Sequence, residues 1–192
     1  MFFSRKRPEV LLMQTGEPLA FDLDYIEKFI KDHLTISGES LRNRLDRCVR
    51  IVTLTHPKTN ELIGLAAIKQ PFKTYREKIL KGWSLPEFKY ELGYVALVPS
   101  YRGLGLSSSL IQEALYRFDY NVFSTVDTSN KAMAKTLRQN GFEFSLNFYA
   151  ELDPKKLMSL FILKEKVVEV EKQIFSGWFP VSYTDTTINV SS

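Results

Sequence analysis

Cysteine and histidine are scarce in this sequence, and their scarcity argues against several kinds of site. The 192 residues include one cysteine, Cys48, and two isolated histidines, His33 and His56. A single cysteine cannot form an internal disulfide or a cysteine-rich zinc site. Two isolated histidines are a poor supply for a histidine metal site or a Ser-His-Asp triad. We therefore expect no metal, and we interpret Cys48 as a packed core thiol rather than a nucleophile.

The sequence also lacks a long hydrophobic run and an export signal. Apolar runs such as residues 62–68 are far shorter than the ~20 residues that a membrane-spanning helix needs. The start of the chain, Met-Phe-Phe-Ser-Arg-Lys-Arg-Pro, carries charges with no apolar segment behind them, which is unlike a secretory signal. We therefore expect no membrane contact, and the low cysteine content favours the reducing cytoplasm.

What remains is the composition of a globular chain with a small excess of positive charge. Hydrophobic residues make up 44% and charged residues 25%, a balance that excludes disordered and coiled-coil proteins. The length predicts a single domain over residues 1–192, with a core at about 9–163 and an extension at 164–192. The net charge of +4 is low for a protein that binds nucleic acid tightly.

Hydrophobic periodicity predicts alternating strands and helices, the pattern of an α/β protein. We expect helices at 23–34, 41–49, 106–118 and 130–139, and strands at 9–14, 49–55, 61–69, 91–98, 121–126, 142–151 and 157–164. Residues 56–60 read as a hairpin loop, and 166–175 are ambiguous between helix and strand. The basic and aromatic segment 70–90 predicts either a solvated helix on the sheet or a lid that faces a substrate or RNA.

A glycine-rich turn between a strand and a helix is the strongest functional signal. Arg102-Gly-Leu-Gly-Leu-Ser107 follows the strand at 91–98. Gly103 and Gly105 allow the main chain to approach an anion closely, and the helix that begins near Leu106 adds the positive end of its dipole. Because Arg102 adds a full charge at the same place, we predict a phosphate site.

Two other phosphate motifs do not fit this turn. A Walker A loop would need a lysine after Gly105, and none is present. A dinucleotide fingerprint would need a third glycine where Ser108 stands. Neither a kinase-like nor a Rossmann interpretation remains.

The turn resembles the signature of the GNAT superfamily of acyl-CoA-dependent N-acetyltransferases, Arg/Gln-x-x-Gly-x-Gly/Ala. Arg102 to Gly105 match its first four positions, and Ser107, also small, stands at the last. A second family motif matches downstream in Asn130-Lys-Ala-Met133, Leu137 and Gly141-Phe142. The resemblance covers residues 9 to about 163. It implies the GNAT fold, a mixed central sheet of six to seven strands flanked by helices, with splayed central parallel strands at 91–98 and 121–126.

The resemblance implies that acetyl-CoA binds at this splay as co-substrate. The backbone of Leu97 and Val98 would pair with the pantetheine arm like an added strand. The Asn130 side chain would steady the pantetheine near the thioester, although Asn130 could also be a plain helix cap, or serve both roles. The pyrophosphate would be held by the N–H groups of Arg102, Gly103, Leu104, Gly105, Leu106 and Ser107.

In this family the acceptor amine attacks the thioester directly, and an alkyl amine with a pKa of about 10.4 must first lose a proton. The histone-acetylating branch carries a glutamate at the position of Glu91, which makes Glu91 the candidate base. The alternative for Glu91 is an exposed carboxylate at the strand edge. Asp127 is the reserve base, or only a helix cap. A strand N–H near Leu97 would stabilise the oxyanion.

The family's usual acid, a tyrosine that protonates the departing thiolate, falls at Leu137 here, and leucine cannot donate a proton. Tyr149 is the substitute that we name, with Tyr101 and Tyr116 as further options. Each of the three could instead be a packing tyrosine. A thiol with a pKa near 8.5 is a tolerable leaving group, so a dedicated acid could also be dispensable.

The expected function is N-acetyl transfer from acetyl-CoA to a primary amine of a small molecule or protein. An alternative is a nucleic-acid-directed acyltransferase, such as a toxin that acetylates aminoacyl-tRNA or a phage-type base-modifying enzyme. The basic segment 69–90 and Arg5-Lys-Arg7 favour it, while the low net charge argues against it. A third is a non-catalytic acyl-CoA-binding GNAT domain that regulates a partner. The C-terminal strands and tail could also pair with a second copy to form a homodimer.

Overall fold

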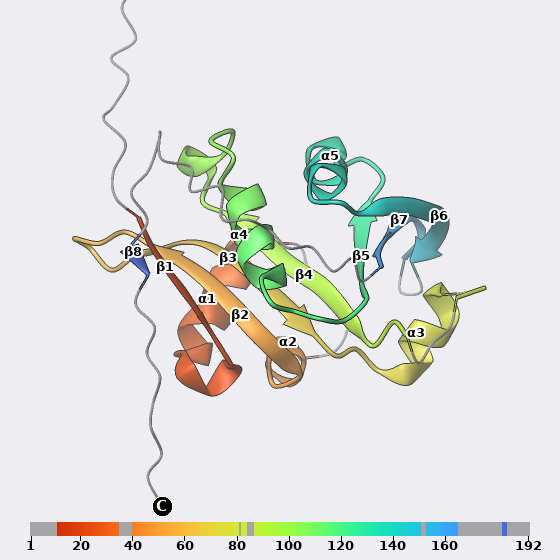
Figure 1. Cartoon of the computed structure of the whole chain (residues 1–192), viewed down its shortest axis with the longest axis horizontal. Coiled ribbons are helices and arrows are strands. Elements are labelled where there is room, and N and C mark those ends of the chain that lie inside the picture. The colour runs from red at the N-terminus through yellow and green to blue at the C-terminus, as the bar shows by residue number, and fades with distance from the viewer. Residues whose placement is uncertain are drawn as a thin grey trace, which may run out of the picture.

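A mixed β-sheet organises the chain (Figure 1). The computed structural model describes residues 11–34, 40–80, 82–83, 87–150, 153–164 and 182–183. The strand order in the sheet is β6-β7-β5-β4-β3-β2-β1-β8. The strands are β1 (Leu12–Gly16), β2 (Cys48–Thr55), β3 (Leu62–Lys69), β4 (Tyr90–Leu97), β5 (Val122–Asp127), β6 (Glu143–Ala150), β7 (Asp153–Leu163) and the two-residue β8 (Ser182–Tyr183).

The sheet is antiparallel except at two pairs of strands. The first four strands form a meander in which each strand pairs with the next. The chain then crosses over through a helix, so that β5 pairs with β4 in parallel. At the other edge, β8 pairs in parallel with β1. The seven longer strands and their helices confirm the expected mixed sheet.

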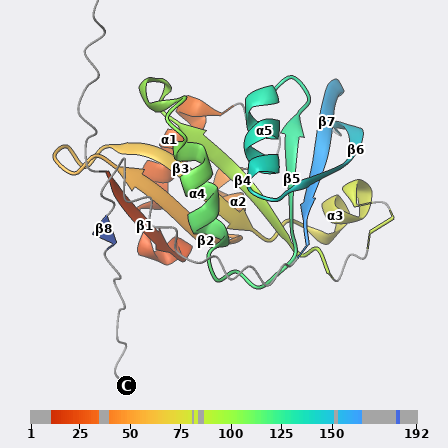
Figure 2. The ribbon, with the colours of Figure 1, turned by 45° about the horizontal axis from the view of Figure 1, so that its top comes forward.

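Helices cover both faces of this sheet, as Figure 2 shows for α4 in front and α1 behind. They are α1 (Leu23–His33), α2 (Leu41–Leu45), α3 (Lys73–Ile79), α4 (Leu106–Leu115) and α5 (Lys131–Gln139), with 3-10 turns η1 (Pro18–Ala20) and η2 (Pro99–Tyr101). The apolar sides of α4 and α5 pack on one face of the sheet. Those of α1 and α2 pack on the other, and α3 packs through Ile79 beside β5 and β7.

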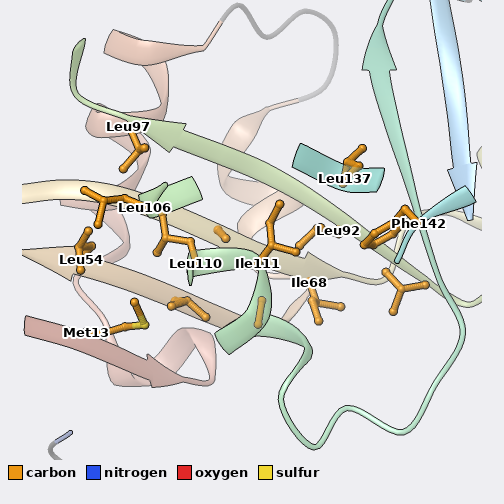
Figure 3. Close-up of a cluster of buried hydrophobic side chains, with 14 of the residues drawn as sticks. Met13, Leu54, Ile68, Leu92, Leu97, Leu106, Leu110, Ile111, Leu137 and Phe142 are labelled. Carbon is orange, nitrogen blue, oxygen red and sulfur yellow. The ribbon is translucent and has the colours of Figure 1, made fainter. Parts of the chain in front are cut away.

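The largest apolar core lies between the sheet and α4 and α5 (Figure 3). Leu106, Leu110 and Ile111 of α4 lie over Leu54 and Leu92 of the strands. Because these side chains are almost completely buried, the start of α4 is held firmly against the strand that precedes it. This packing fixes the position of the glycine turn between β4 and α4.

One expected helix is wrong beyond its first turn. The helical spacing of Leu41, Leu45 and Cys48 predicted a helix to residue 49, but α2 ends at Leu45 and Cys48 begins β2. Cys48 pairs there with Lys69 of β3, and it still reaches the core that Leu41 and Leu45 enter. The spacing of Leu41, Leu45 and Cys48 fits either a longer helix or a short helix followed by a turn and a strand. The pairing of Cys48 with β3 decides for the strand. Cys48 is buried, and its Sγ donates to the Arg44 carbonyl at 3.7 Å, which confirms a packed thiol.

The other expected elements agree with the structure to within a few residues. The helix expected to run to 118 ends at Leu115, although Phe118 still packs against the core. In the segment 70–90, α3 forms, with Lys73 and Lys78 exposed. Residues 1–10 and the ambiguous element at 166–175 lie outside the described residues. Within the residues that are described, no helix is long and apolar enough to span a bilayer.

Candidate active site

The parallel strands β4 and β5 separate soon after they meet. They pair only at Tyr90 with Val122 and at Glu91 with Phe123, yet both strands continue, and Figures 1 and 2 show them diverging. The Ser124 hydroxyl donates to the Leu92 carbonyl at 2.9 Å, which bridges the strands where the ladder stops. Past this point one side of β4 has no strand partner, as the GNAT resemblance implied for these strands.

Leu97 and Val98 differ in how their main-chain groups are used. The Val98 N–H donates to the Ile63 carbonyl of β3 at 2.8 Å, and the Val98 carbonyl accepts from the Tyr101 N–H at 3.0 Å. Successive residues of a strand point their N–H groups to opposite sides. The N–H of Leu97 therefore points away from β3, into the gap beside β5. Both residues were expected to pair with a ligand, and only Leu97 presents its N–H in that direction.

The glycine turn presents a run of N–H groups at the start of α4. Gly103 and Gly105 have left-handed φ angles of 78° and 80°, which glycine adopts without strain. Within residues 87–150, no main-chain carbonyl accepts a hydrogen bond from the N–H groups of 103–107. No atom lies within 4 Å of where a Cβ on either glycine would stand. The turn therefore offers open space beside unused donors, which is the arrangement that binds an anion.

Arg102 lies at the junction between this turn and β4. Its Nε donates to the Leu97 carbonyl at 3.3 Å, and the residue as a whole is exposed. The guanidinium therefore lies next to Leu97, the last residue of β4, on the side of the strand that has no partner. One positive charge, the open N–H run and the free side of β4 occur together at this point.

Glu91 lies at the other end of the gap, and it is buried rather than exposed. Only 3% of the residue is accessible, so the interpretation as an exposed strand-edge carboxylate is wrong. Its Oε1 accepts from the Thr125 hydroxyl at 3.0 Å, and its Oε2 lies 3.1 Å from Lys69 Nζ. Burial alone would lower the pKa of Lys69, but the carboxylate of Glu91 raises it. The structure therefore holds a charged pair where the two strands separate.

Glu91, Lys69 and Thr125 form a group that we call the Glu91 cluster, and two tyrosines that the sequence analysis missed complete it. Tyr75 of α3 has its hydroxyl 3.4 Å from that of Thr125, and burial raises its pKa. The Tyr94 ring lies 4.8 Å from Lys69 Nζ. Lys69 pairs with Glu91 across β3 and β4, but a long connection containing α3 joins these strands, so the sequence alone does not give their register. The two tyrosines come from a helix and a strand bulge that no spacing in the sequence indicates.

A model of the acetyltransferase (GNAT) family matches residues 19–142, which is more than half of the chain. This chain belongs to the GNAT acetyltransferase family. No curated protein matches the sequence. The matched region includes the diverging strands, the glycine turn and the Glu91 cluster.

Solved structures share the fold at low sequence identity. Arabidopsis thaliana NAA60 in complex with a bisubstrate analogue has a TM-score of 0.62 and 17% identity, covering 82% of this chain and 100% of that chain. The NatC complex bound to Gag peptide and CoA has a TM-score of 0.59 and 15% identity, with 82% and 99% coverage. A Vibrio cholerae spermidine N-acetyltransferase, SpeG, has a TM-score of 0.55 and 14% identity, with 80% and 93% coverage.

The GNAT motif residue Asn130 is a helix cap in this chain. Its Oδ1 accepts from the Met133 N–H at 3.0 Å at the start of α5, so the capping interpretation is confirmed. The residue is exposed, which leaves its amide nitrogen able to donate elsewhere.

Asp127, the reserve base, stabilises the turn that follows β5. It accepts from the N–H and hydroxyl of Ser129, and these bonds hold the pKa of its carboxyl below the usual value.

The structure does not bring Tyr149 together with Glu91. Tyr149 is 67% exposed on β6, the edge strand, and β7 and β5 lie between it and β4. Tyr101 packs partly against the main core, and Tyr116 follows the end of α4. Leu137, at the position of the usual GNAT acid, is completely buried.

A hollow on the described surface does not include Glu91 or the glycine turn in its lining. It has a volume of about 520 Å³ and lies between α5 and the strands β6 and β7, with Arg138 and Phe144 among its lining. Among the described residues, no group of three or more His, Cys, Asp or Glu could hold a metal ion. The candidate site is therefore defined by the diverging strands and the polar groups at the two ends of their gap.

Proposed function

We propose that this chain is an N-acetyltransferase that moves an acetyl group from acetyl-CoA to a primary amine of a small molecule or protein. The observation that carries the proposal is the open run of N–H groups at 103–107 beside the unpaired side of β4. A thioester with a long polar arm and a pyrophosphate matches both parts. The turn fits the phosphates, and the strand fits the arm.

The turn and β4 would bind different parts of acetyl-CoA. The N–H groups from Gly103 to Ser107 would hold the pyrophosphate, helped by the positive end of α4 and by the side chain of Arg102, whose own N–H donates to the Pro99 carbonyl at 3.2 Å. The N–H of Leu97 would pair with the pantetheine arm as a further strand does. Asn130 would add its amide nitrogen while its oxygen caps α5. Val98 would not pair with the arm, because its N–H and carbonyl already bond to Ile63 and Tyr101. These bonds hold the end of β4 in place beside Leu97.

The Glu91 cluster lies on the face of the sheet where the acceptor would approach. The thioester, when bound, supplies an acyl group to a neutral amine. Glu91 would receive the proton that the amine must lose, directly or through water. Lys69 Nζ lies 3.1 Å from Glu91 Oε2, so a positive charge stands beside the proposed base. Glu91 is thus our proposed catalytic base, and its burial indicates that only a small group reaches it.

The structure offers no dedicated acid for the departing thiolate among the residues that we named. Two strands, β7 and β5, separate Tyr149 from β4, so we no longer favour it. We propose instead that the thiolate of CoA leaves without a protein acid, because a thiol pKa near 8.5 makes it a tolerable leaving group.

The similar structures suggest which amines to try first. They include one protein bound to a peptide and CoA, and one described as a spermidine N-acetyltransferase. We propose the same two classes, peptide and polyamine amines, as candidate acceptors here. The single-domain organisation, the cytoplasmic location and the homodimer remain predictions.

The test is an incubation of the protein with radiolabelled acetyl-CoA and a cell lysate, followed by separation into protein, nucleic-acid and small-molecule fractions. We expect label in the protein or small-molecule fraction. Label in the nucleic acid alone would replace our proposal with the nucleic-acid-directed alternative. No transfer to any fraction, with acetyl-CoA still bound, would favour the non-catalytic alternative.

A further inference from the structure

Tyr94 carries a buried hydroxyl that the rest of the protein does not use. The residue is 8% exposed, and its Oη has no hydrogen-bond partner among the described residues. A buried polar group without a partner costs stability. A phenylalanine would fill the same space without that cost. The hydroxyl therefore needs an explanation outside the packing of the core.

The backbone at Tyr94 is also strained. Its φ angle is 53°, in the left-handed region that bulky residues rarely adopt. The register of β3 and β4 shifts here, since Leu65 pairs with Ala96 whereas Ala67 pairs with Gly93. Tyr94 and its neighbour thus form a β-bulge, a feature that re-aims side chains beside functional sites.

The bulge places Tyr94 on the same face of the sheet as Glu91. In a regular strand, residues three apart point to opposite faces. Here Tyr94 packs in the core beneath α1 and α2, on the side of the sheet where Lys69 approaches both the Tyr94 ring and Glu91. The extra residue in β4 therefore places the Tyr94 ring next to Lys69, on the face of the sheet that holds the charged pair.

The charged pair offers an incoming amine few free hydrogen-bond acceptors. One oxygen of Glu91 accepts from Thr125, and the other faces Lys69. An amine that attacks a carbonyl must direct its lone pair at the carbon while its N–H groups find acceptors. The phenol oxygen of Tyr94 is an acceptor on this face that has neither a hydrogen bond nor an ion pair among the described residues, whereas Glu91 Oε2 lacks a hydrogen bond but faces Lys69. Burial raises the pKa of Tyr94, so the phenol stays neutral in ordinary buffers.

We propose that the Tyr94 hydroxyl binds the acceptor amine and orients it for attack, so that Tyr94 is a substrate-positioning residue of the acceptor site. This inference rests on the proposed function, because it needs an amine acceptor. It adds a residue that neither GNAT motif in this sequence contains. It also explains why a strained bulge and an unsatisfied hydroxyl occur at one position.

The experiment compares Tyr94→Phe with wild type and with Tyr90→Phe. Tyr90 lies on the same strand, in an aromatic cluster with Phe118 and Tyr120, and controls for the loss of a tyrosine hydroxyl. The probes are spermidine and a short peptide with a free N-terminus, together with any acceptor that the lysate experiment yields. Three quantities are measured for each protein: kcat and KM for the acceptor, acetyl-CoA hydrolysis without acceptor, and Tm.

For Tyr94→Phe we expect kcat/KM for the acceptor to fall about tenfold, the effect of one lost hydrogen bond. Hydrolysis without acceptor should be unchanged, and Tm should be equal or higher because an unsatisfied group is gone. Tyr90→Phe should keep wild-type kcat/KM. A purely structural role would instead lower Tm and reduce transfer and hydrolysis together.

Equal transfer by wild type and Tyr94→Phe would overturn this inference and leave the proposed function standing. A parallel loss of Tm, hydrolysis and transfer would also overturn it, because the hydroxyl would then support the fold. If wild type acetylates neither the probes nor any lysate fraction, the proposed function itself fails, and the inference fails with it.

Discussion

Lys69 and Glu91 are cross-strand neighbours whose charged ends lie 3.1 Å apart, Nζ to Oε2. The side chains are only 16% and 5% exposed. Removing one member of such a buried pair leaves the other charge without compensation, at a cost of about 3–5 kcal/mol. This pair therefore links the stability of the sheet to the chemistry that we propose for Glu91.

The first prediction concerns Glu91→Gln. Glutamine keeps the size of the side chain and can still accept from Thr125, but it cannot take a proton or balance Lys69. We expect turnover to fall by at least about a hundredfold, in the range for loss of a general base, with little change in acetyl-CoA affinity. Steady-state kinetics and a CoA titration measure the two effects.

A matched double variant separates stability from chemistry in that experiment. Lys69→Met with Glu91→Gln removes both charges, so it should recover much of the Tm that the single variant loses. It should recover no activity. If turnover returned with Tm, Glu91 would be a structural residue and our base assignment would be wrong.

The second prediction concerns the glycine turn. Gly105→Ala places a Cβ at a φ angle of 80°, which strains the turn by about 1–2 kcal/mol. We expect acetyl-CoA affinity to fall at least tenfold, because the displaced N–H groups no longer converge on a phosphate. Gly82→Ala provides the control, since Gly82 has a φ of 84° and equally open surroundings. A similar loss of affinity in both variants would contradict the phosphate site.

The third prediction separates the two roles of Asn130. Asn130→Ser retains a capping oxygen for α5 but loses the amide nitrogen, while Asn130→Ala loses both. We expect the alanine variant to lose about 1 kcal/mol of stability and the serine variant to lose little. Both should bind acetyl-CoA more weakly if the amide contacts the pantetheine. Wild-type affinity in Asn130→Ser would leave capping as the whole role.

The fourth prediction is a pH dependence that comes from Cys48. Burial raises the pKa of its thiol from 9.0 to about 12. Between these values the unfolded chain loses a proton that the folded chain keeps, so stability falls as pH rises. The contribution is complete below pH 9, and its loss follows a slope of about 1.4 kcal/mol per pH unit. Denaturant unfolding of wild type and Cys48→Ala at pH 8 to 11 tests this, and parallel curves would contradict it.

The sequence predicted the parts of this protein that depend on local pattern. The glycine turn, the cap at Asn130 and most strands follow from spacing that one segment carries by itself. Cys48 was misplaced because apolar residues at helical spacing also fit a turn followed by a strand, and the pairing with Lys69 decides between them.

The polar cluster depends on contacts that the sequence does not display. Thr125 contacts Glu91 from a neighbouring strand, and Tyr75 of α3 contacts Thr125, both across long stretches of chain. The burial of Glu91 follows from the same contacts. The bulge at Tyr94 has one local signal, Gly93, because a glycine inside a strand often marks a bulge, and the sequence analysis did not use it. Non-local packing, rather than propensity, assembles this half of the candidate site.

The burial of Leu137 limits how this chain could change over time. Leu137 lies in the core near Phe142 and has no exposed surface (Figure 3). A tyrosine in its place would overpack a closed core, and forced repacking typically costs 1–3 kcal/mol. A single substitution therefore cannot restore, without loss of stability, the acid that the GNAT resemblance implies at this position.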